Sequence, residues 1–313
     1  MRVPWCSHCL LHEVNTLAKR VQLTGLPFVL PAVIMLMLIA FVPTIYSLMM
    51  SVLDIRGWRV QGSSFVGLRN YVLVFQDSIF IGALWFSARY MITAVIVQLA
   101  VGTVLAYLCF LVGEQRPRLA NVLALFVMLP VLLPQVATAT IFKLILNDTI
   151  GLIPALLRNM GISFSVTSNA TSAFFALVLV DSWQWTPFIF LLMFAGMRMV
   201  PGEVLEAARV EGAGAVRQLF SILLPMCGYM TTVAVVLRSI WLFRAYEVPH
   251  IVTAGGPGTF TRTVSMQIFQ FAFREGRLGS GAAATFIVFV SVNIAVAFYY
   301  SIVKRRTETR RAT

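Results

Sequence analysis

Six long apolar runs dominate the 313-residue chain, and each can cross a lipid bilayer as an α-helix. A helix needs roughly 20 mainly apolar residues to span the hydrocarbon core. With 59% hydrophobic and only 12% charged residues, the chain has too little charge to cover a water-soluble globule. The sequence therefore predicts an all-α membrane protein with six transmembrane helices. They lie near Gly25–Met50, Tyr90–Val112, Leu119–Leu146, Ala173–Met197, Met226–Tyr246 and Ala282–Val303.

We expect these spans to form one transmembrane domain, residues 25–303, between a leader at residues 1–24 and a basic tail at residues 304–313. The first run is longer than a secretory signal needs and has no small-residue cleavage site, so we expect it to be retained as a helix. Prolines lie within several spans, among them Pro31, Pro43, Pro130, Pro134 and Pro187. A helix bundle tolerates them because neighbouring helices can satisfy the freed carbonyls.

Basic residues are distributed unevenly over the segments between the spans. The segments on the side of both termini carry thirteen Lys and Arg residues, whereas the opposite segments carry seven. Because Lys and Arg are enriched on the cytoplasmic side, we expect both termini and the connection at residues 198–225 to be cytoplasmic. The net charge of +12 then reflects topology and contact with the lipid bilayer, and we expect no nucleic-acid partner.

The connection at residues 201–225 has the sequence PGEVLEAARVEGAGAVRQLFSILLP. Pro201 can begin a helix without losing a hydrogen bond, and glutamates in its first turns suit the helix dipole. Gly212 and Gly214 then permit a sharp turn. Apolar residues follow at the spacing of one helical face: Val216, Leu219, Phe220 and Leu223. The pattern predicts a helix, a glycine turn and a second helix under the membrane, with Pro225 starting the next span.

This segment resembles the EAA loop in permease subunits of binding-protein-dependent ABC importers. In that family a Glu-Ala-Ala triplet precedes a Gly and a hydrophobic-Pro ending, here Glu206, Ala207, Ala208, Gly212, Leu224 and Pro225. Carbohydrate-type members often have Asp-Gly-Ala in the middle, where this chain has Glu211-Gly212-Ala213. The resemblance implies a coupling helix that docks on an ATPase. The residues implied are Glu203, Glu206, Ala207, Ala208, Glu211, Gly212, Ala213, Leu224 and Pro225.

Further matches to this family follow in the expected order between Phe65 and Thr261. They are the segment FVGLRNY at residues 65–71, the outer stretch from Gly151 to Gly161, Trp183 with Thr186-Pro187-Phe188, and the glycine-rich loop from Thr253 to Thr261. Pro154 replaces a usual Asn. The chain is similar to maltose-type and glycerol-phosphate-type permeases, and the resemblance implies the type I ABC importer fold.

The resemblance implies a transport subunit of the bacterial plasma membrane, not an enzyme, that moves a sugar or sugar-like solute. Its implied partners are a second related permease in a heterodimer, an ABC ATPase dimer and a solute-binding protein outside, facing Gly255, Gly256 and Pro257. None of the three lysines follows a Gly, so the chain has no phosphate-binding Gly-Lys-Ser/Thr motif. We therefore expect ATP and Mg on the ATPase and no cofactor on this chain. Disaccharide, monosaccharide, amino sugar and glycerol phosphate derivatives remain open as solutes.

Polar and aromatic residues within the fourth and fifth spans are candidates for the wall of the solute path. Charges inside a membrane are costly unless they are paired or face water. Aromatic faces can stack on sugar rings while polar groups bind hydroxyls. Interfacial anchoring and a structural ion pair are the alternative interpretation. The candidates are Asp181, Trp183, Gln184, Arg238, Trp241 and Tyr246.

The leader contains Cys6, Cys9 and His12 at a spacing that zinc can use. We expect no metal there, because no second ligand cluster accompanies it. Two other function classes compete with a transport subunit. A membrane enzyme would need carboxylates, His or a metal cluster at the membrane face, and an ion-coupled transporter would need repeat symmetry and broken helices at midplane. Neither class explains residues 206–225.

Overall fold

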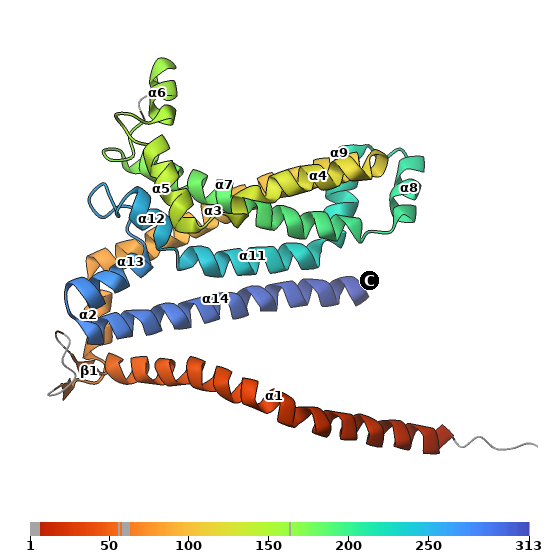
Figure 1. The fold of residues 1–313 in the computed structure, drawn as a ribbon, viewed down its shortest axis with the longest axis horizontal. Coiled ribbons are helices and arrows are strands. Elements are labelled where there is room, and N and C mark those ends of the chain that lie inside the picture. The colour runs from red at the N-terminus through yellow and green to blue at the C-terminus, as the bar shows by residue number, and fades with distance from the viewer. Residues whose placement is uncertain (1–6, 56, 58–62, 163, 313) are drawn as a thin grey trace, which may run out of the picture.

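Figure 1 shows the computed structural model as a bundle of long helices that run along a common direction. The structure describes residues 7–55, 57, 63–162 and 164–312, and their side chains between residues 29 and 297. The long helices are α1 (Ser7–Ser51), α3 (Ser78–Gln115), α4 (Pro117–Met128), α7 (Ala170–Arg198), α11 (Gly228–Phe243) and α14 (Leu278–Ala312).

Short elements gather at the two ends of the bundle (Figure 1). One end holds β1 (Leu53–Asp54), β2 (Ser64–Phe65), α2 (Arg69–Gln76), α5 (Gln135–Ile145), α6 (Leu152–Asn159), α12 (Glu247–Val252), α13 (Val264–Phe269) and η3 (Gln270–Arg274). The two strands pair antiparallel, with Leu53 opposite Phe65. The other end holds α8 (Gly202–Val210), α9 (Ala215–Gln218), the π-helix η2 (Leu219–Leu223) and α10 (Leu224–Met226). We refer to these ends as the α12 end and the α8 end.

Six spans are found among the described residues when each bent helix pair is counted as one span. Four are single helices, with bounds Val29–Ser51, Ser78–Gln115, Ala170–Arg198 and Leu278–Ala297. The third span bends by 89° between the 3₁₀-helix η1 (Leu129–Leu132) and α5, and the fifth bends by 72° between α10 and α11. The six-span all-α architecture that the sequence predicts is therefore confirmed, but two spans are broken.

Two of the long helices, α3 and α7, begin after a residue whose side chain accepts a hydrogen bond from a free amide of the first turn. The carboxylate of Asp77 accepts a hydrogen bond from the Phe80 amide at 2.8 Å before α3, and Asn169 accepts one from Thr171 at 2.9 Å before α7. Helix α4 begins with Pro117, whose missing N–H costs nothing in a first turn. Asp77 and Asn169 therefore mark the beginnings of the second and fourth spans.

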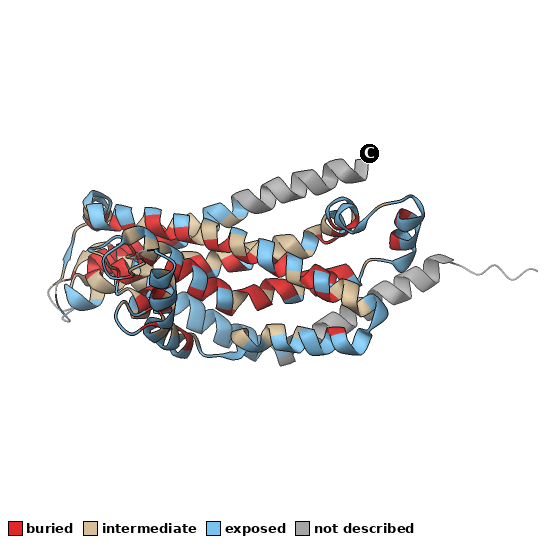
Figure 2. Ribbon diagram, turned by 90° about the horizontal axis from the view of Figure 1, so that it is seen from above, coloured by how far each residue is buried: buried red, intermediate tan, exposed pale blue. Residues whose placement is uncertain are grey.

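The core of the bundle lies between α3 and α7. A Cβ atom on Gly102 of α3 would lie 3.1 Å from both Ile189 Cγ2 and the Phe190 amide nitrogen of α7. Small residues allow this close helix approach in membranes. Figure 2 shows that buried residues concentrate in the interior helices, whereas the described part of α1 is exposed. An exposed apolar helix of this kind suits a bilayer rather than water.

The break in the third span confirms how a bundle accommodates proline. Pro134 has no amide hydrogen to donate, and the 3₁₀-helix ends at Leu132, one residue before Leu133. The Gln184 side chain of α7 donates a hydrogen bond to the Leu133 carbonyl at 2.9 Å. A neighbouring helix thus satisfies a carbonyl that the broken helix leaves free. The apolar run at residues 119–146 is not one straight helix for this reason.

Two features of the sequence analysis fall outside what the structure describes. Cys6 lies outside the described residues, and the side chains of Cys9 and His12 are not described either. The same holds for the side chains of the basic tail at residues 304–313. The expectations of a metal-free leader and of a basic tail that contacts the lipid bilayer stay predictions.

Candidate functional site

The helix–turn–helix predicted at residues 201–225 is present at the α8 end of the bundle. Helix α8 ends in a left-handed residue, Gly212, with φ of +78°. The Ala213 amide then donates to the Ala208 carbonyl at 2.9 Å, which closes the helix end. Gly214, by contrast, has φ of −65°, a value that any residue adopts. The turn therefore requires glycine at position 212 and not at position 214.

This coupling loop, residues 201–226, is fastened to α3 at two points. The Tyr107 hydroxyl of α3 donates to the Ala215 carbonyl at 2.7 Å. The Arg209 guanidinium of α8 pairs with the Glu114 carboxylate near the end of α3. Leu205 is buried against the bundle. A force applied to α8 is thus transmitted to the longest described span.

The outer surface of the coupling loop carries apolar and acidic side chains together. The apolar members are Val204, Val210, Val216 and Phe220, and Val210 is 90% exposed. Glu203, Glu206, Ala207 and Glu211 of the same loop are also exposed. A loop that exposes both apolar and charged side chains is suited to contact with another protein. Of the predicted docking residues, Ala208 is buried in this chain's own fold, Ala213 and Leu224 are partly buried, and Pro225 is exposed.

Two expectations for this loop are wrong. Leu219 and Leu223 are buried but Val216 and Phe220 are exposed, so the four do not share one face. The π-helix at Leu219–Leu223 is the reason, because its wider turn shifts the register of a helical stripe. Pro225 also does not begin the span. It lies in α10, inside the first half of the bent fifth span, whose second half, α11, begins at Gly228.

Three spans meet at a buried ion pair in the interior of the bundle. The Arg238 guanidinium of α11 donates to the Asp181 carboxylate of α7 at 2.5 Å and to the Gln98 side-chain oxygen of α3 at 2.9 Å. The Gln98 amide also donates to Asp181 at 2.7 Å. Asp181 and Arg238 are only 2% and 1% exposed. The structural ion pair considered for Arg238 therefore exists, and its partner lies in another span.

Aromatic rings surround this pair on one side. The Arg238 guanidinium carbon lies 4.8 Å from the Trp185 ring centroid and 5.9 Å from that of Trp241. The two indole rings are 5.2 Å apart, and Phe188 lies 5.2 Å from Trp241. Arginine over an indole face is a favourable cation–π arrangement. The ion pair and the indoles therefore form one packed unit.

A cavity of about 520 Å³ opens beside this unit toward the α12 end. Asp181, Trp185, Arg238 and Trp241 form its inner wall. The exposed side chains of Arg244 and Glu247 lie at the junction of α11 and α12 and also line it. It combines aromatic faces with hydrogen-bonding groups, as a pocket for a polyhydroxylated solute requires.

The other predicted path residues lie elsewhere. Trp183 is 44% exposed and packs against Phe142 with 5.2 Å between ring centroids. Gln184 serves the break in the third span. Tyr246 stacks on His250 at 4.9 Å between ring centroids. Gln98 is not among the candidates that the sequence indicates, although a single amide within an apolar run is a signal for such a residue.

The glycine-rich loop at residues 253–261 is folded by two threonines. The Thr253 and Thr261 hydroxyls lie 2.7 Å apart, and Thr261 also donates to the Gly256 carbonyl at 2.7 Å. Gly255 is buried with φ of +87°, and Gly256 and Pro257 are partly buried. The exposed tip of the loop is formed by residues 258–260. Gly255, Gly256 and Pro257 therefore shape the loop, whereas residues 258–260, which follow them, are exposed.

A second segment at the α12 end is organised by Asp148, which follows α5. Its carboxylate accepts hydrogen bonds from the Ser165 hydroxyl at 2.8 Å, the Val166 amide at 3.0 Å and the Thr167 amide and hydroxyl. Burial opposes ionisation of the carboxyl, but these hydrogen bonds outweigh it and lower the pKa of Asp148 below its usual value. The bonds hold residues 165–167 beside α6.

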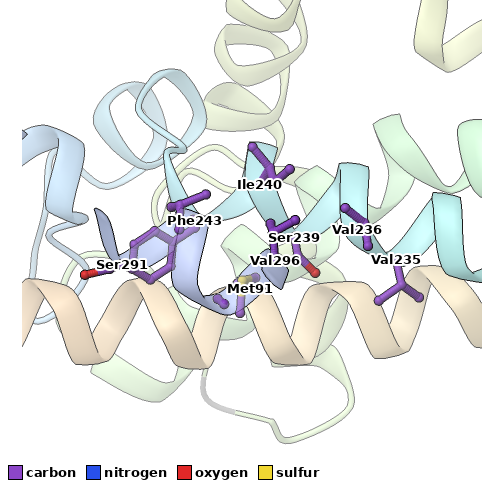
Figure 3. Close-up of a pocket in the computed structure, with 10 residues that line it drawn as sticks. Met91, Val235, Val236, Ser239, Ile240, Phe243, Ser291 and Val296 are labelled. Carbon is purple, nitrogen blue, oxygen red and sulfur yellow. The ribbon is translucent and has the colours of Figure 1, made fainter. Parts of the chain in front are cut away.

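Figure 3 shows a different kind of cavity, of about 340 Å³, between α3, α11 and α14. Met91, Val235, Val236, Ile240 and Phe243 line it, and none of its ten lining residues is charged. Such a surface contacts apolar groups and offers a polar solute almost no hydrogen bonds. The polar cavity beside Arg238 is therefore the better candidate for the solute path.

Residues 98–309 match the family described as binding-protein-dependent transport system inner membrane component. The chain is 33% identical over 229 residues to the trehalose/maltose transport system permease protein MalF of Thermococcus litoralis. The matched residues cover 73% of this chain and 76% of MalF. The chain is 30% identical over 278 residues to the sulfoquinovosyl glycerol transport system permease protein SmoG of Agrobacterium fabrum, covering 88% and 89% of the two chains.

The sn-glycerol-3-phosphate transport system permease protein UgpA of Agrobacterium fabrum is 25% identical, covering 90% of this chain and 95% of UgpA. A crystal structure of a bacterial alginate ABC transporter, in complex with a periplasmic protein that carries an alginate pentasaccharide, contains a chain of the same fold. The TM-score is 0.78 at 19% identity, covering 92% of this chain and 96% of that chain. The chain therefore belongs to the family of inner membrane components of binding-protein-dependent transport systems, and it is a permease subunit of an ABC importer rather than an enzyme.

Proposed function

We propose that this permease imports a sugar or sugar-like solute across the bacterial plasma membrane, with both termini and the coupling loop in the cytoplasm. The relatives named above are permeases for trehalose and maltose, sulfoquinovosyl glycerol or sn-glycerol-3-phosphate, which supports the solute class. The excess of Lys and Arg on the segments at the α8 end supports the orientation. The α12 end then faces the outside.

The coupling loop docks on an ATPase in this proposal. The exposed apolar and acidic surface around Val210 is the observation that carries it. ATP and Mg bind to the ATPase, and this chain holds no cofactor. Closure of an ATPase dimer moves α8, and the anchors at Tyr107 and Arg209 pass this movement to α3. The loop also continues through α10 into α11, which carries Arg238 and Trp241.

The proposal includes two further partners. A second, related permease completes a heterodimer around the solute path, so that the cavity beside Arg238 forms one wall of that path. A solute-binding protein docks at the outside, where the loop tip at residues 258–260 and helix α6 are exposed. α6 extends away from the bundle at this end (Figure 1), which supports its availability to such a partner.

Two glycine substitutions in one turn test the docking. Gly212→Val forces a β-branched residue into a left-handed conformation, whereas Gly214→Val introduces the same side chain at a permitted φ. A Cβ atom meets no neighbour within 4 Å at either position, so neither change causes a clash within this chain. We expect Gly212→Val to lose most sugar uptake and ATPase copurification at a normal amount of permease in the membrane, and Gly214→Val to retain both. Wild-type uptake and copurification in both variants would contradict the docking.

A further inference from the structure

We propose that the cavity beside Arg238 accepts an uncharged sugar ring and that Asp181 sets this selectivity by neutralising Arg238. The inference rests on the proposed sugar-import function and narrows its solute class. It distinguishes a neutral pyranose from the anionic and cationic sugars that the sequence leaves open. Asp181 is thus a specificity-determining residue that acts through the charge of its partner.

The charges around the cavity cancel in two layers. On the inner wall, the Asp181 carboxylate lies 2.5 Å from the Arg238 guanidinium, and both side chains are almost fully buried. Toward the opening, Glu247 and Arg244 contribute one charge of each sign. A charged solute group brought into this cavity loses hydration and meets no net opposite charge, which is unfavourable at low dielectric.

The inner wall also offers what a neutral sugar ring uses. Trp185 and Trp241 present two indole rings with centroids 5.2 Å apart, and apolar faces of pyranose rings pack on such surfaces. The Trp185 indole N–H is buried and has no hydrogen-bond partner among the described residues. A buried donor without a partner is costly, and Trp185 lines the cavity. A sugar hydroxyl supplies the missing acceptor without carrying charge.

Three probes of similar size separate the alternatives by charge: methyl α-glucoside is neutral, glucuronate is an anion, and glucosamine is a cation slightly below neutral pH. Their saturable binding is measured by equilibrium dialysis on the purified complex of both permeases and the ATPase. We expect the wild-type complex to prefer methyl α-glucoside. A wild-type complex that binds none of the three, or that prefers glucuronate or glucosamine, would overturn the proposal.

Variants of the ion pair then shift the preference in opposite directions. Asp181→Asn leaves Arg238 uncompensated and raises the affinity for glucuronate relative to methyl α-glucoside by at least about tenfold. Arg238→Gln leaves Asp181 uncompensated and raises relative glucosamine affinity by a similar factor. The double variant removes both charges with nearly unchanged shapes, so neutral preference returns. Asp77→Asn, at the N-cap of α3 and outside the cavity, leaves all ratios unchanged.

The ratios of the affinities for the three probes separate an effect on selectivity from an effect on stability, because a destabilised complex loses binding of all three probes equally. If one single variant does not assemble, the comparison still works. The remaining single variant should shift the preference toward a charged probe, and the double variant should restore the preference for methyl α-glucoside. Equal loss of binding for all three probes in the assembled single variants would show that the pair only supports the fold and would overturn the proposal. Sugar uptake by the wild-type complex is a separate measurement, so this result would leave the proposed import function intact.

Discussion

Arg238 shows how the fold accommodates a charge in the middle of an apolar helix. An arginine at the centre of a span costs about 2.5–3.5 kcal/mol on insertion scales. Here one carboxylate and one amide accept its hydrogen bonds, and two indole faces cover it. Removal of one member of a buried pair costs about 3–5 kcal/mol, because the other charge is left unpaired. Asp181, Gln98 and Arg238 therefore also tie three spans together.

Asp148 gives a residue-scale prediction for pH. Its pKa is lowered in the folded protein, so the stabilisation from its hydrogen bonds is complete above the unfolded value of about 3.9 and is lost as pH falls through the folded pKa. We expect hydrogen-exchange protection of the Val166 and Thr167 amides, corrected for intrinsic rates, to fall over this acid range. Asp148→Ala should lower that protection about tenfold at neutral pH, since hydrogen bonds to charged groups contribute about 1.5–3 kcal/mol.

The control for this prediction is the pH dependence of amide protection in the Asp148→Ala variant. In Asp148→Ala the acid-dependent loss of protection at Val166 and Thr167 should disappear, because the titrating group is gone. Persistence of the same pH response in the variant would contradict the role assigned to Asp148.

At the scale of elements, close contact between α3 and α7 sets the spacing of the core. Gly102 permits this contact, because a Cβ atom there would press on Ile189 and Phe190. We expect Gly102→Val to destabilise the assembled protein by about 1–3 kcal/mol through overpacking. Thermal unfolding in detergent, followed by the loss of soluble permease, measures the effect.

Gly82→Val is the matched control on the same helix. Gly82 is exposed, and a Cβ atom at this position meets nothing within 4 Å. Its unfolding temperature should therefore stay much closer to the wild-type value. Both variants make the same change in intrinsic helix propensity, so an unfolding temperature for Gly102→Val at or above that of Gly82→Val would contradict the role assigned to the α3–α7 contact.

Hydropathy predicts the six spans well, because each helix needs about 20 mainly apolar residues to cross the hydrocarbon core of the bilayer. It does not predict the bends. Pro130 and Pro134 mark where the third span can break, but the 89° angle depends on the bond from Gln184 to Leu133 and on packing around α5. The π-helix at Leu219–Leu223 likewise follows no sequence period that a helical wheel detects.

The candidate sites differ in how far sequence predicts them. The coupling loop is local, so Gly212 and its helix can be identified from one segment. The cavity is assembled from α3, α7 and α11, and the sequence indicates polar residues without indicating which of them meet. Trp183 and Trp185 are two positions apart in α7, which places their rings on different sides of the helix, and Trp185 faces the cavity.

At the scale of the whole molecule, the coupling loop and the cavity share the fifth span. The loop ends in α10, the chain bends by 72°, and α11 continues to Arg238 and Trp241. A movement of α8 therefore reaches the inner wall of the cavity through one continuous stretch of chain. In the proposed function, this connection allows ATP hydrolysis on a partner to change access to the cavity beside Arg238.

The most direct test of ATP-driven import separates ATP from the proton gradient in cells. The probe is a radiolabelled sugar whose uptake is lost when this chain is deleted and restored when it is supplied. We predict that uptake stops when ATP is depleted and continues in the presence of an uncoupler while ATP is maintained. Uptake that survives ATP depletion but stops with the uncoupler would contradict the account and indicate ion-coupled transport.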